Sequence, residues 1–435
     1  MYNIIWWVLR PILPLVLGWR QQKGKEQAGR RQDRYGQPHF DSRLSGVIWL
    51  HSVSIGETIA AISLAKALAQ TQPAAQFLIT TNTVSAAELV RRETATGLPL
   101  FHAFQPLDHP LFVDRFLAKI KPRIAIFMES DFWPNLISRT AAKSVPVIFA
   151  SSQLSTVAFQ RWIRNPSLAK SVFAAPQLVL AVATTQARQF HQLGTPADCI
   201  TVLGSLKLGN LLKIDKAFCQ QFKTAVAGRK ILLAASTHEG EDACVINAAN
   251  ALGEGWLTLI APRHPHRGSD IAAICNMAPQ RSLGQWPSAD RNLYIMDSFG
   301  EMGSLFNLAD LTILGGSFVP KGGHNPLEPA AFGLPIITGP HIFKNAGEFA
   351  GLRDSGVVFD IAGDGADPVK AGQALANVAI AIMKDKAQYR HIASAAKKYA
   401  ATARKRNDNA ATVSYTHLRA HETREDLGWR LVREK

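Results

Sequence analysis

Three charged residues stand shortly after apolar runs that are typical of buried strands, and their types suit catalysis. Glu57 comes after Val47–Leu50, Glu129 follows Ile124–Met128, and Lys207 closes the last apolar run of the first half. In open α/β sheets, ligands bind beyond the carboxyl ends of the strands, so we expect these side chains to reach a common site. A carboxylate there can take a proton from an attacking hydroxyl, and a lysine can balance negative charge in a transition state.

Each of these residues also has a purely structural interpretation. Glu57 opens a predicted helix, where the helix dipole stabilises a carboxylate by on the order of 0.3–1 kcal/mol. Glu129 and Asp131 could do no more than cap the next helix, and Lys207 could be a solvated linker residue. The polar loop His51–Gly56 favours substrate binding for Glu57, whereas both interpretations of Glu129 stay open.

The segment Gly315–Gly339 combines a glycine-rich loop with a strong helix-start signal. It follows the apolar run Leu311–Leu314. Asn325 suits the helix N-cap, with Pro326 at the first helical position and Glu328 completing a capping box. Glycines let the backbone approach a ligand closely, and a helix start offers free N–H groups. We therefore expect this loop to hold an anion, namely a nucleotide phosphate; an ordinary strand–loop–helix turn is the alternative.

A basic stretch, Pro262–Arg267, follows another apolar run, and its Arg263 suits bidentate phosphate recognition. Its two histidines resemble a metal-binding pair only superficially, because no acidic partner follows, so we expect no metal. The sequence has no D-x-D triplet of the metal-dependent sugar-nucleotide enzymes, and the order Lys321-Gly322-Gly323 is not a P-loop. We expect arginine, lysine and backbone N–H groups to bind a leaving phosphate.

Composition bounds the class of partner. The 435-residue chain has a formal net charge of +15 and 47% hydrophobic residues, so it can form two domains. The charge favours an anionic partner: nucleic acid, anionic lipid or a phosphorylated substrate. Its 4 cysteines lie far apart without a C-x-x-C pair, so the sequence indicates neither a zinc site nor a disulfide framework, which fits a reducing cytosolic setting.

Residues 4–19 form an apolar stretch that predicts membrane association. Arg10 interrupts it, Pro11 and Pro14 would kink a helix, and about 20 unbroken apolar residues are needed to span a bilayer. The stretch could span the membrane with Arg10 snorkelling, or lie at the interface with its tryptophans at headgroup depth. The basic segment 20–34 places the rest of the chain on the cytoplasmic side by the positive-inside rule; it could also be a flexible, solvated linker.

From Val47 onward, short apolar runs alternate with helix-period segments, a pattern typical of parallel strands covered on both faces. Two sets of about six strands predict two doubly wound α/β domains with a boundary within residues 206–229. The predicted strands are Val47–Leu50, Phe77–Thr81, Ile124–Met128, Val145–Ala150, Leu178–Ala183, Thr201–Leu203, Ile231–Ala235, Leu257–Ala261, Asn292–Met296, Leu311–Leu314, Leu334–Thr338 and Val357–Phe359.

The two halves repeat one pattern of strand, polar loop, Gly-Glu and helix. It occurs at Gly56-Glu57 and again at Gly240-Glu241. Because loops at strand ends carry ligand-binding groups in such sheets, we expect both loops and the glycine-rich loop to face a cleft between the two domains.

Several stretches occur together in one order: HSVSIGET, MESDFWPNLI, GSLK, STHEGE, PRHP, FGEM and GGSFVPKGGHNPLE. With them the chain resembles the 3-deoxy-D-manno-octulosonic acid (Kdo) transferases of Gram-negative lipopolysaccharide synthesis over roughly residues 1–400. The resemblance implies a GT-B fold with an N-terminal anchor in the bacterial inner membrane and catalytic domains on its cytoplasmic face. It also implies transfer of Kdo from CMP-Kdo to lipid IVA, with inversion and without a bound metal or a nucleic-acid partner.

The same resemblance assigns roles to individual residues. Glu57 would deprotonate the sugar hydroxyl of the acceptor, and Glu129 and Lys207 would stabilise the transition state. The CMP contacts would come from Pro262, Arg263, Phe299, Gly300, Glu301, Asn325, Pro326, Leu327 and Glu328. Phe299 replaces the family's usual Met, and MESD departs from the commoner METE, which leaves open a side-chain role for Phe299 and the role of Asp131.

On this basis, residues 1–34 are predicted to be a membrane anchor and basic linker, and residues 35–215 an acceptor-binding Rossmann-like domain. Residues 216–411 are predicted to form the CMP-sugar-binding domain, and residues 412–435, which lack a clear apolar face, a non-native tail. Two other functions compete with this one. The motifs argue against a GT-B enzyme for another nucleotide sugar or an epimerase, and the paired carboxylates argue against a non-catalytic basic protein that binds membranes or nucleic acid.

Overall fold

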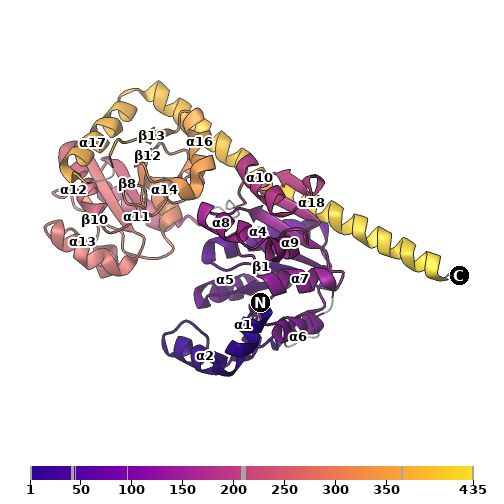
Figure 1. The fold of residues 1–435 in the computed structure, drawn as a ribbon. Helices are drawn as coiled ribbons and strands as arrows, with labels where there is room; N and C mark the ends of the chain where they lie inside the picture. The colour runs from indigo at the N-terminus through magenta and orange to yellow at the C-terminus, as the bar shows by residue number, and fades with distance from the viewer. Residues whose placement is uncertain are drawn as a thin grey trace. The chain divides into compact units, whose positions relative to one another are not determined.

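The computed structural model describes residues 2–40, 44, 46–95, 97–206, 212–363 and 366–433 (Figure 1). The chain forms two compact units. The first comprises Met1–Asn210 together with Arg404–Lys435, and the second comprises Leu211–Ala403. The sequence assigned residues up to 411 to the second domain, and this limit is wrong, because the last helix rejoins the first unit from Arg404 onward.

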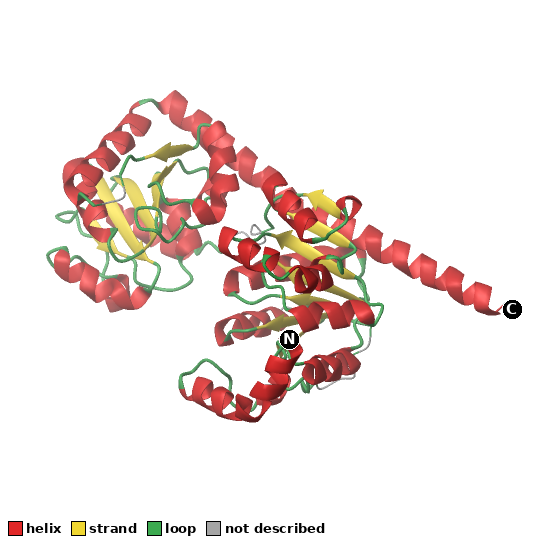
Figure 2. Cartoon of the chain, in the orientation of Figure 1, coloured by secondary structure: helices red, strands yellow, loops and turns green. Residues whose placement is uncertain are grey.

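A parallel sheet of seven described strands forms the centre of the first unit, in the order β3-β2-β1-β4-β5-β6-β7. Helices lie on both of its faces (Figure 2). The strands are β1 (Ile48–His51), β2 (Phe77–Thr81), β3 (Leu100–Phe104), β4 (Ile124–Met128), β5 (Val147–Ser152), β6 (Leu178–Ala181) and β7 (Ile200–Val202). The sequence predicted each of these strands except β3, which lies at the edge of the sheet.

Alternating side chains of this sheet enter two separate apolar cores. Trp49 and Phe127 pack with the aromatic side chains of one core, and Leu50 and Ile126 pack in the other. Because successive residues of a strand point to opposite faces, the continuous apolar runs serve both cores at once. The helices that cover these cores are α4 (Ile55–Thr71), α5 (Val84–Thr94), α6 (Pro110–Ile120), α7 (Pro134–Ala142), α8 (Thr156–Ile163), α9 (Pro166–Phe173) and α10 (Thr184–Leu193).

The second unit repeats this plan with a six-stranded parallel sheet in the order β10-β9-β8-β11-β12-β13. Its strands are β8 (Lys230–Thr237), β9 (Trp256–Pro262), β10 (Leu293–Ile295), β11 (Leu311–Leu314), β12 (Ile336–Thr338) and β13 (Val358–Asp360). The chain runs outward in one direction from β8 to β10 and in the other from β11 to β13. The switch point therefore lies between β8 and β11, where ligands bind in this class of fold.

The second unit's helices precede and follow these strands. They are α11 (Lys216–Val226), α12 (Asp242–Leu252), α13 (Gly268–Ile274), α14 (Met302–Leu308), α15 (Leu327–Phe332), α16 (Ala346–Asp354), α17 (Pro368–Lys384) and the start of α18 (Lys386–Arg433). Helix α18 then continues through the suspected tail, and its Ala410 is buried in a core of the first unit.

The apolar N-terminal stretch is broken in the middle, as its prolines predicted. It consists of α1 (Tyr2–Leu9), a 3-10 turn (Arg10–Ile12) and α2 (Leu13–Gln22). Within the part of the chain that the structure describes, none of the helices combines the length and the apolar character that crossing a membrane requires.

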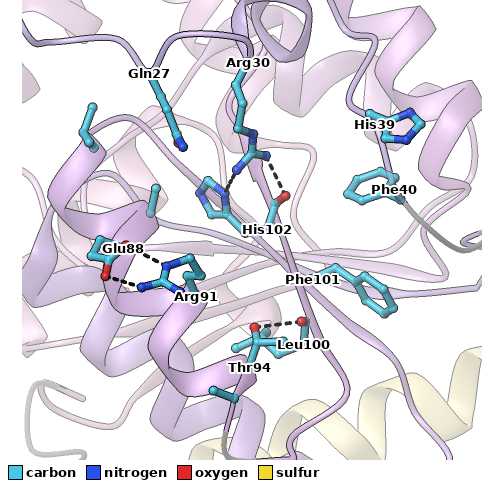
Figure 3. A pocket seen from close by; sticks show the side chains of 13 residues that line it. Gln27, Arg30, His39, Phe40, Glu88, Arg91, Thr94, Leu100, Phe101 and His102 are labelled. Atoms are coloured by element: carbon cyan, nitrogen blue, oxygen red, sulfur yellow. Dashed lines mark hydrogen bonds and ion pairs between the residues drawn. The ribbon is translucent and has the colours of Figure 1, made fainter.

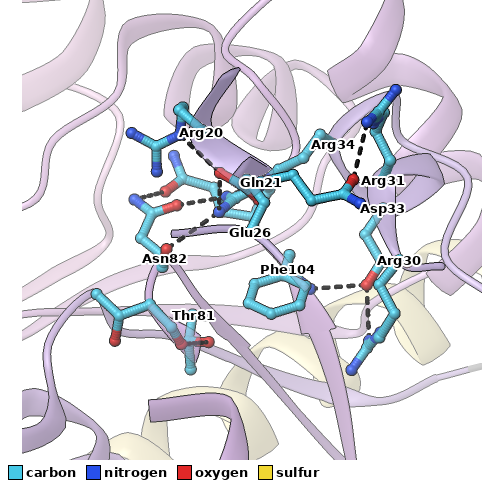
Figure 4. Close-up of polar contacts among 12 residues, drawn as sticks. Arg20, Gln21, Glu26, Arg30, Arg31, Asp33, Arg34, Thr81, Asn82 and Phe104 are labelled. Carbon is cyan, nitrogen blue, oxygen red and sulfur yellow. Dashed lines mark hydrogen bonds and ion pairs between the residues drawn. The ribbon is translucent and has the colours of Figure 1, made fainter. Parts of the chain in front are cut away.

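The basic segment after α2 is part of the first unit and not a free linker. Arg34 is 4% exposed, and its guanidinium donates to Glu26, to Asn82 and to the carbonyl of Gln105 (Figure 4). The carboxylate of the buried Asp33 accepts the backbone N–H of Phe104, in β3, at 2.9 Å. The interpretation of this segment as a flexible, solvated linker is therefore wrong, because burying an arginine requires the partners it has here.

Candidate active site

Glu57 lies in the first turn of α4 and is held by a capping box. Its carboxylate accepts the backbone N–H of Val53 at 2.6 Å and that of Ser54 at 3.4 Å, while the Ser54 hydroxyl accepts the Glu57 N–H. Glu57 therefore does stabilise the start of a helix, as its structural interpretation predicted. This role does not exclude a second one in catalysis. The side chain is only half-buried, which leaves the carboxylate within reach of a ligand.

The surroundings of Glu57 make it more basic than an ordinary carboxylate. Burial raises the pKa of the Glu57 carboxyl, and the negative charge of Glu129 raises this pKa further, as does that of Asp131. The N–H of Val53 and the nearby His51 act in the opposite direction. A like-charged neighbour disfavours the ionised form, and an elevated pKa increases the affinity of the carboxylate for a proton.

Glu129 occupies a strained position at the end of β4. Its φ of 56° lies in the left-handed region that a non-glycine residue rarely adopts. Two backbone bonds hold it there: its N–H donates to Ala150 at 2.9 Å, and its carbonyl accepts from Gln153 at 3.2 Å. Strain of this kind persists where the surrounding structure enforces it, and it is common at functional sites.

Asp131 organises a buried histidine that sequence reasoning did not single out as a site residue. His51 Nε2 lies 3.0 Å from the Asp131 carboxylate, and its Nδ1 lies 2.8 Å from the Thr80 hydroxyl. The indole N–H of Trp133 donates to the same carboxylate at 2.5 Å, and that of Trp49 donates to Thr80 at 2.9 Å. Because Thr80 accepts from Trp49, it can donate to His51 Nδ1, which leaves Nε2–H to donate to Asp131.

The alternative interpretation, in which Glu129 and Asp131 only cap the next helix, is wrong. The first N–H groups of α7 go instead to the buried Asp108, which accepts from Asn135 at 2.9 Å and from Leu136 at 2.7 Å. Burial raises the pKa of Asp108 to about 7 against these bonds. The acids that follow β4 are therefore not needed as helix caps and can serve other purposes.

Lys207, the third predicted catalytic residue, lies outside the described residues. The segment leading to it is anchored in the first unit, because the Leu206 N–H donates to the Ser151 hydroxyl at 3.0 Å beside the end of β5. Ser151 also has a positive φ of 55°. Residues 204–206 thus approach the carboxyl ends of the strands, where Glu129 also lies.

In the second unit, the glycine-rich loop does hold an anion, but that anion belongs to the chain itself. The carboxylate of Glu241 accepts the N–H groups of Gly316 at 2.8 Å, Ser317 at 3.0 Å and Phe318 at 2.9 Å, and also that of His238 at 2.8 Å. The N–H groups of Gly316, Ser317 and Phe318 are therefore not available to a nucleotide phosphate. That the rest of the Gly315–Gly339 segment, including the start of the next helix, binds a phosphate stays a prediction.

Two glycines of this loop are required, Gly315 by a close contact and Gly316 by its backbone conformation. A Cβ on Gly315 would lie 2.2 Å from the carbonyl oxygen of Ser236 at the end of β8, far inside contact distance. Gly316 has a φ of 71°, in the left-handed region. The loop therefore packs tightly across the carboxyl end of β8, and Glu241 locks it there.

The helix that follows starts one residue later than predicted. Helix α15 begins at Leu327, and the Asn325 side-chain oxygen accepts its N–H at 3.2 Å. Pro326 is the residue before the helix instead of its first residue. Burial raises the pKa of Glu328, while its hydrogen bond with Asn325 and the charge of Arg263 oppose this shift. The Asn325–Glu328 segment and Arg263 therefore share one neighbourhood.

Basic side chains gather at the carboxyl ends of β8, β9 and β11. Arg263 follows Pro262, the last residue of β9, and is exposed. His238 Nε2 lies 2.9 Å from His324 Nε2, and the ring of His264 lies 6.2 Å from that of His238. Among the described residues, no group of three or more His, Cys, Asp or Glu side chains could hold a metal ion. The cluster is suited to an anion.

The second predicted CMP stretch, Phe299–Glu301, has an exposed backbone and a carboxylate that is already paired. Phe299 is 84% exposed, and Gly300 adopts a φ of 87°. Glu301 accepts from the guanidinium of Arg281 at 2.9 Å and also from the Ser298 hydroxyl. A backbone contact of Phe299 and Gly300 with a ligand is sterically possible, whereas the Glu301 carboxylate is already paired.

A pocket of about 600 Å³ lies elsewhere in the first unit, between α5 and the edge strand β3 (Figure 3). Arg30 reaches over it and bonds the carbonyl of His102 at 2.8 Å and its Nδ1 at 2.7 Å. Phe40 and Phe101 line the pocket's apolar side, and Arg91 is paired with Glu88. The predicted site residues that the structure describes are not among its lining residues.

Comparisons with known proteins agree on a family. A family model described as 3-deoxy-D-manno-octulosonic-acid transferase (kdotransferase) matches residues 22–210. A probable mitochondrial 3-deoxy-D-manno-octulosonic acid transferase of Arabidopsis thaliana is 33% identical over 79% of both chains. The 3-deoxy-D-manno-octulosonic acid transferase of Haemophilus influenzae is 30% identical over 79% of this chain and 82% of its own.

A solved structure supports the fold. The structure of a putative UDP-N-acetylglucosamine 2-epimerase from Listeria monocytogenes matches 86% of this chain and 97% of its own, with a TM-score of 0.62 and 11% identity. At that identity the likeness concerns the fold alone. Together with the two parallel-sheet units, it supports the predicted GT-B class of α/β fold.

Proposed function

Because the chain belongs to the 3-deoxy-D-manno-octulosonic acid (Kdo) transferase family and is thus a glycosyltransferase, we propose that it moves Kdo from CMP-Kdo to lipid IVA. The observation that carries this proposal is family membership, combined with a half-buried Glu57 whose pKa is raised at the end of β1. This reaction would occur in lipopolysaccharide synthesis and invert the anomeric centre.

In this reaction Glu57 acts as the general base. Its carboxylate removes the proton from the attacking sugar hydroxyl as that oxygen bonds to the anomeric carbon and the bond to the phosphate of CMP breaks. The raised pKa supports this role, because a carboxylate that binds a proton more tightly is a better base at neutral pH. Glu129 and Lys207 stabilise the transition state in this proposal.

The second unit binds the donor. The cytidylate contacts come from Pro262 and Arg263, from Phe299–Glu301 and from Asn325–Glu328. The support is electrostatic, because basic side chains gather where the strand order reverses. Glu241 already occupies three of the loop's backbone N–H groups. No resident metal is needed in this proposal, because arginine, lysine and histidine carry the charge that faces the phosphate.

The first unit also associates with the cytoplasmic face of an anionic inner membrane, lying at the interface. Exposed apolar side chains on α1 and α2 support this: Val8 is 71% exposed, Leu15 is 75% exposed and Trp19 is 54% exposed. Leu13 and Leu17 face inward on the same stretch. An apolar surface flanked by basic residues suits insertion at headgroup depth.

The transfer reaction is tested by incubating the full chain with CMP-Kdo and lipid IVA and measuring product masses. The expected result is lipid IVA heavier by one or more Kdo residues, with CMP released in equal amount. UDP-N-acetylglucosamine serves as the control donor. Transfer from the control donor alone, or release of CMP without a heavier lipid, would contradict the proposal.

Membrane association is tested by vesicle sedimentation of a Val8→Ser/Leu15→Ser variant. Deleting residues 1–34 would be a poor test, because Asp33 and Arg34 are buried in the first unit. The variant is expected to lose most of its binding to anionic vesicles. A matched control, Ile274→Ser/Val369→Ser, changes residues of the second unit that are 61% and 66% exposed. Equal sedimentation of both variants and the wild type would refute an interfacial anchor.

A further inference from the structure

Two histidines from different loops meet at the switch point of the second sheet. His238 follows β8 and His324 follows β11, and these strands are neighbours. The two Nε2 atoms lie 2.9 Å apart, and the ring planes differ by only 2°. A hydrogen bond between two imidazole nitrogens requires one N–H and one bare nitrogen, so the pair holds a proton between its rings.

The loop geometry brings the two rings together. A Cβ on Gly316 would lie 3.4 Å from a ring carbon of His238 and 3.4 Å from one of His324. The carboxylate of Glu241 holds both the Gly316 N–H and the His238 N–H, each at 2.8 Å. One buried carboxylate therefore holds the backbone of both loops, and this fixes the positions of the two histidines relative to each other.

Positive charge surrounds the pair from every neighbouring segment. Arg263, His264 and Arg267 follow β9, Lys321 belongs to the glycine-rich loop, and Lys344 precedes α16. Four acids lie in the neighbourhood. Glu241 is fully engaged by backbone N–H groups, and Asp242 is paired with Arg267. Glu328 lies near Arg263, and the exposed Glu239 follows His238 in the chain. The ring of His266 stacks on that of His264.

The half-buried pair is neutral at neutral pH in this setting. Burial, followed by the charges of His264 and Lys321, lowers the pKa of His238 to about 4. Burial, followed by the charges of His238 and Arg263, lowers the pKa of His324 to about 4. The second cause weakens when an anion enters, since its negative charge offsets the nearby cations and favours the imidazolium form.

We propose that His238 and His324 together bind the phosphate of the donor, and that the pair takes up one proton from solvent as the phosphate arrives. The proton converts a neutral imidazole into an imidazolium, so both rings can direct N–H groups at phosphate oxygens. This inference deepens the proposed function and rests on its donor chemistry. It adds two phosphate-binding residues outside the predicted set.

Because phosphate binding is coupled to proton uptake, the direction in which affinity changes with pH is determined. The pair's pKa is higher in the complex than in the free protein, so affinity for the phosphate is greatest at low pH. It falls as pH rises between the two pKa values, by up to about tenfold per pH unit. Above the pKa of the complex, affinity no longer changes with pH through this pair.

The test is calorimetric titration of the full chain with the methyl ester of CMP between about pH 5 and pH 8, in buffers of different ionisation enthalpy. A diester is chosen because its phosphate does not titrate in this range. The wild type is expected to bind with proton uptake approaching one, and with affinity that falls as pH rises. His238→Gln and His324→Gln, whose amides cannot become cationic, are expected to lose most of this slope.

Two further variants separate the pair from other titrating groups. His391→Gln, on the exposed surface of α18, makes the same change away from the site and is expected to keep the wild-type slope. A slope lost in His264→Gln but kept in His324→Gln would overturn the inference. So would binding to the wild type with a flat pH profile, which would leave the proposed function intact. Failure of the diester to bind at any pH would overturn both.

Discussion

The two units carry the same Gly-Glu pattern at the same place, yet the two carboxylates have different surroundings. Glu57 accepts two N–H groups, both from its own loop, and is half-buried near Glu129 and Asp131. Glu241 is 1% exposed and accepts four N–H groups, one from its own loop and three from the glycine-rich loop. The Glu57 carboxylate therefore stays accessible to a ligand, whereas the Glu241 carboxylate does not.

The difference shows that the pattern specifies a position and the neighbours specify the role. Burial is the leading cause of a raised pKa at both carboxylates. At Glu57 the next cause is a like charge, which increases proton affinity, whereas at Glu241 the next causes are backbone N–H groups, which stabilise the anion. This difference supports the proposed role of Glu57 as general base, and the four N–H groups that Glu241 binds indicate that it anchors the loop.

The largest effect is expected for Glu57→Gln. Glutamine also suits this position of a capping box, so the variant should fold, but it cannot accept the hydroxyl proton. Turnover measured as CMP release should fall by about 10²–10⁴, the range for losing a general base. CMP release close to the wild-type rate would exclude the base assignment and remove the main contrast with Glu241.

Arg263→Ala tests the proposal that the second unit binds the donor. Hydrogen bonds to charged groups contribute about 1.5–3 kcal/mol, so affinity for CMP should fall roughly 10- to 100-fold by calorimetry. Because Arg263 is exposed, the melting temperature should change little. Unchanged CMP affinity would show that the second unit's basic cluster does not bind the donor.

Glu241→Gln is expected to act on stability. Its amide cannot accept all four N–H groups, and each buried group left unpaired costs about 1–3 kcal/mol. The free energy of unfolding from urea titration should fall by at least that amount, whereas Glu57→Gln should cost less than about 1.5 kcal/mol. Equal stability losses in the two variants would contradict the structural role of Glu241.

The smallest effect concerns pH. A base must be ionised, so activity is lost as pH falls through the raised pKa of Glu57. Removing the like charge with Glu129→Gln should move this acid limb of the rate profile to lower pH, by up to about one unit, whatever its effect on the maximal rate. For stability the sign is opposite: a raised folded pKa makes Glu57 ionisation unfavourable, so stability declines as pH rises through it. An acid limb that does not move would mean that Glu129 does not influence Glu57.

Most of the fold followed from local patterns. Continuous apolar runs between helical segments predicted both parallel sheets, because strands buried on both faces need apolar residues throughout. β3 was not predicted because His102 interrupts its apolar run, and Phe101 and His102 are only half-buried there.

The site could be predicted only in part, because several of its determinants are long-range bonds from side chains to backbone. Asp108 caps α7 from 27 residues away, and Glu241 binds Gly316 across 75 residues. Neither contact has a local spacing signature. The clue available for the first was α7 itself, whose N-cap residue Trp133 offers no side-chain acceptor. The clue for the second was the repeated Gly-Glu pattern, which marked both positions without distinguishing their roles.

The most direct test measures single-turnover Kdo transfer by wild type, Glu57→Gln and Glu241→Gln side by side, at a temperature where circular dichroism shows all three folded. The account predicts that Glu241→Gln transfers Kdo within a few-fold of the wild-type rate, while Glu57→Gln is slower by at least about 10². Equal rates for Glu57→Gln and the wild type, or equal losses in both variants, would contradict it.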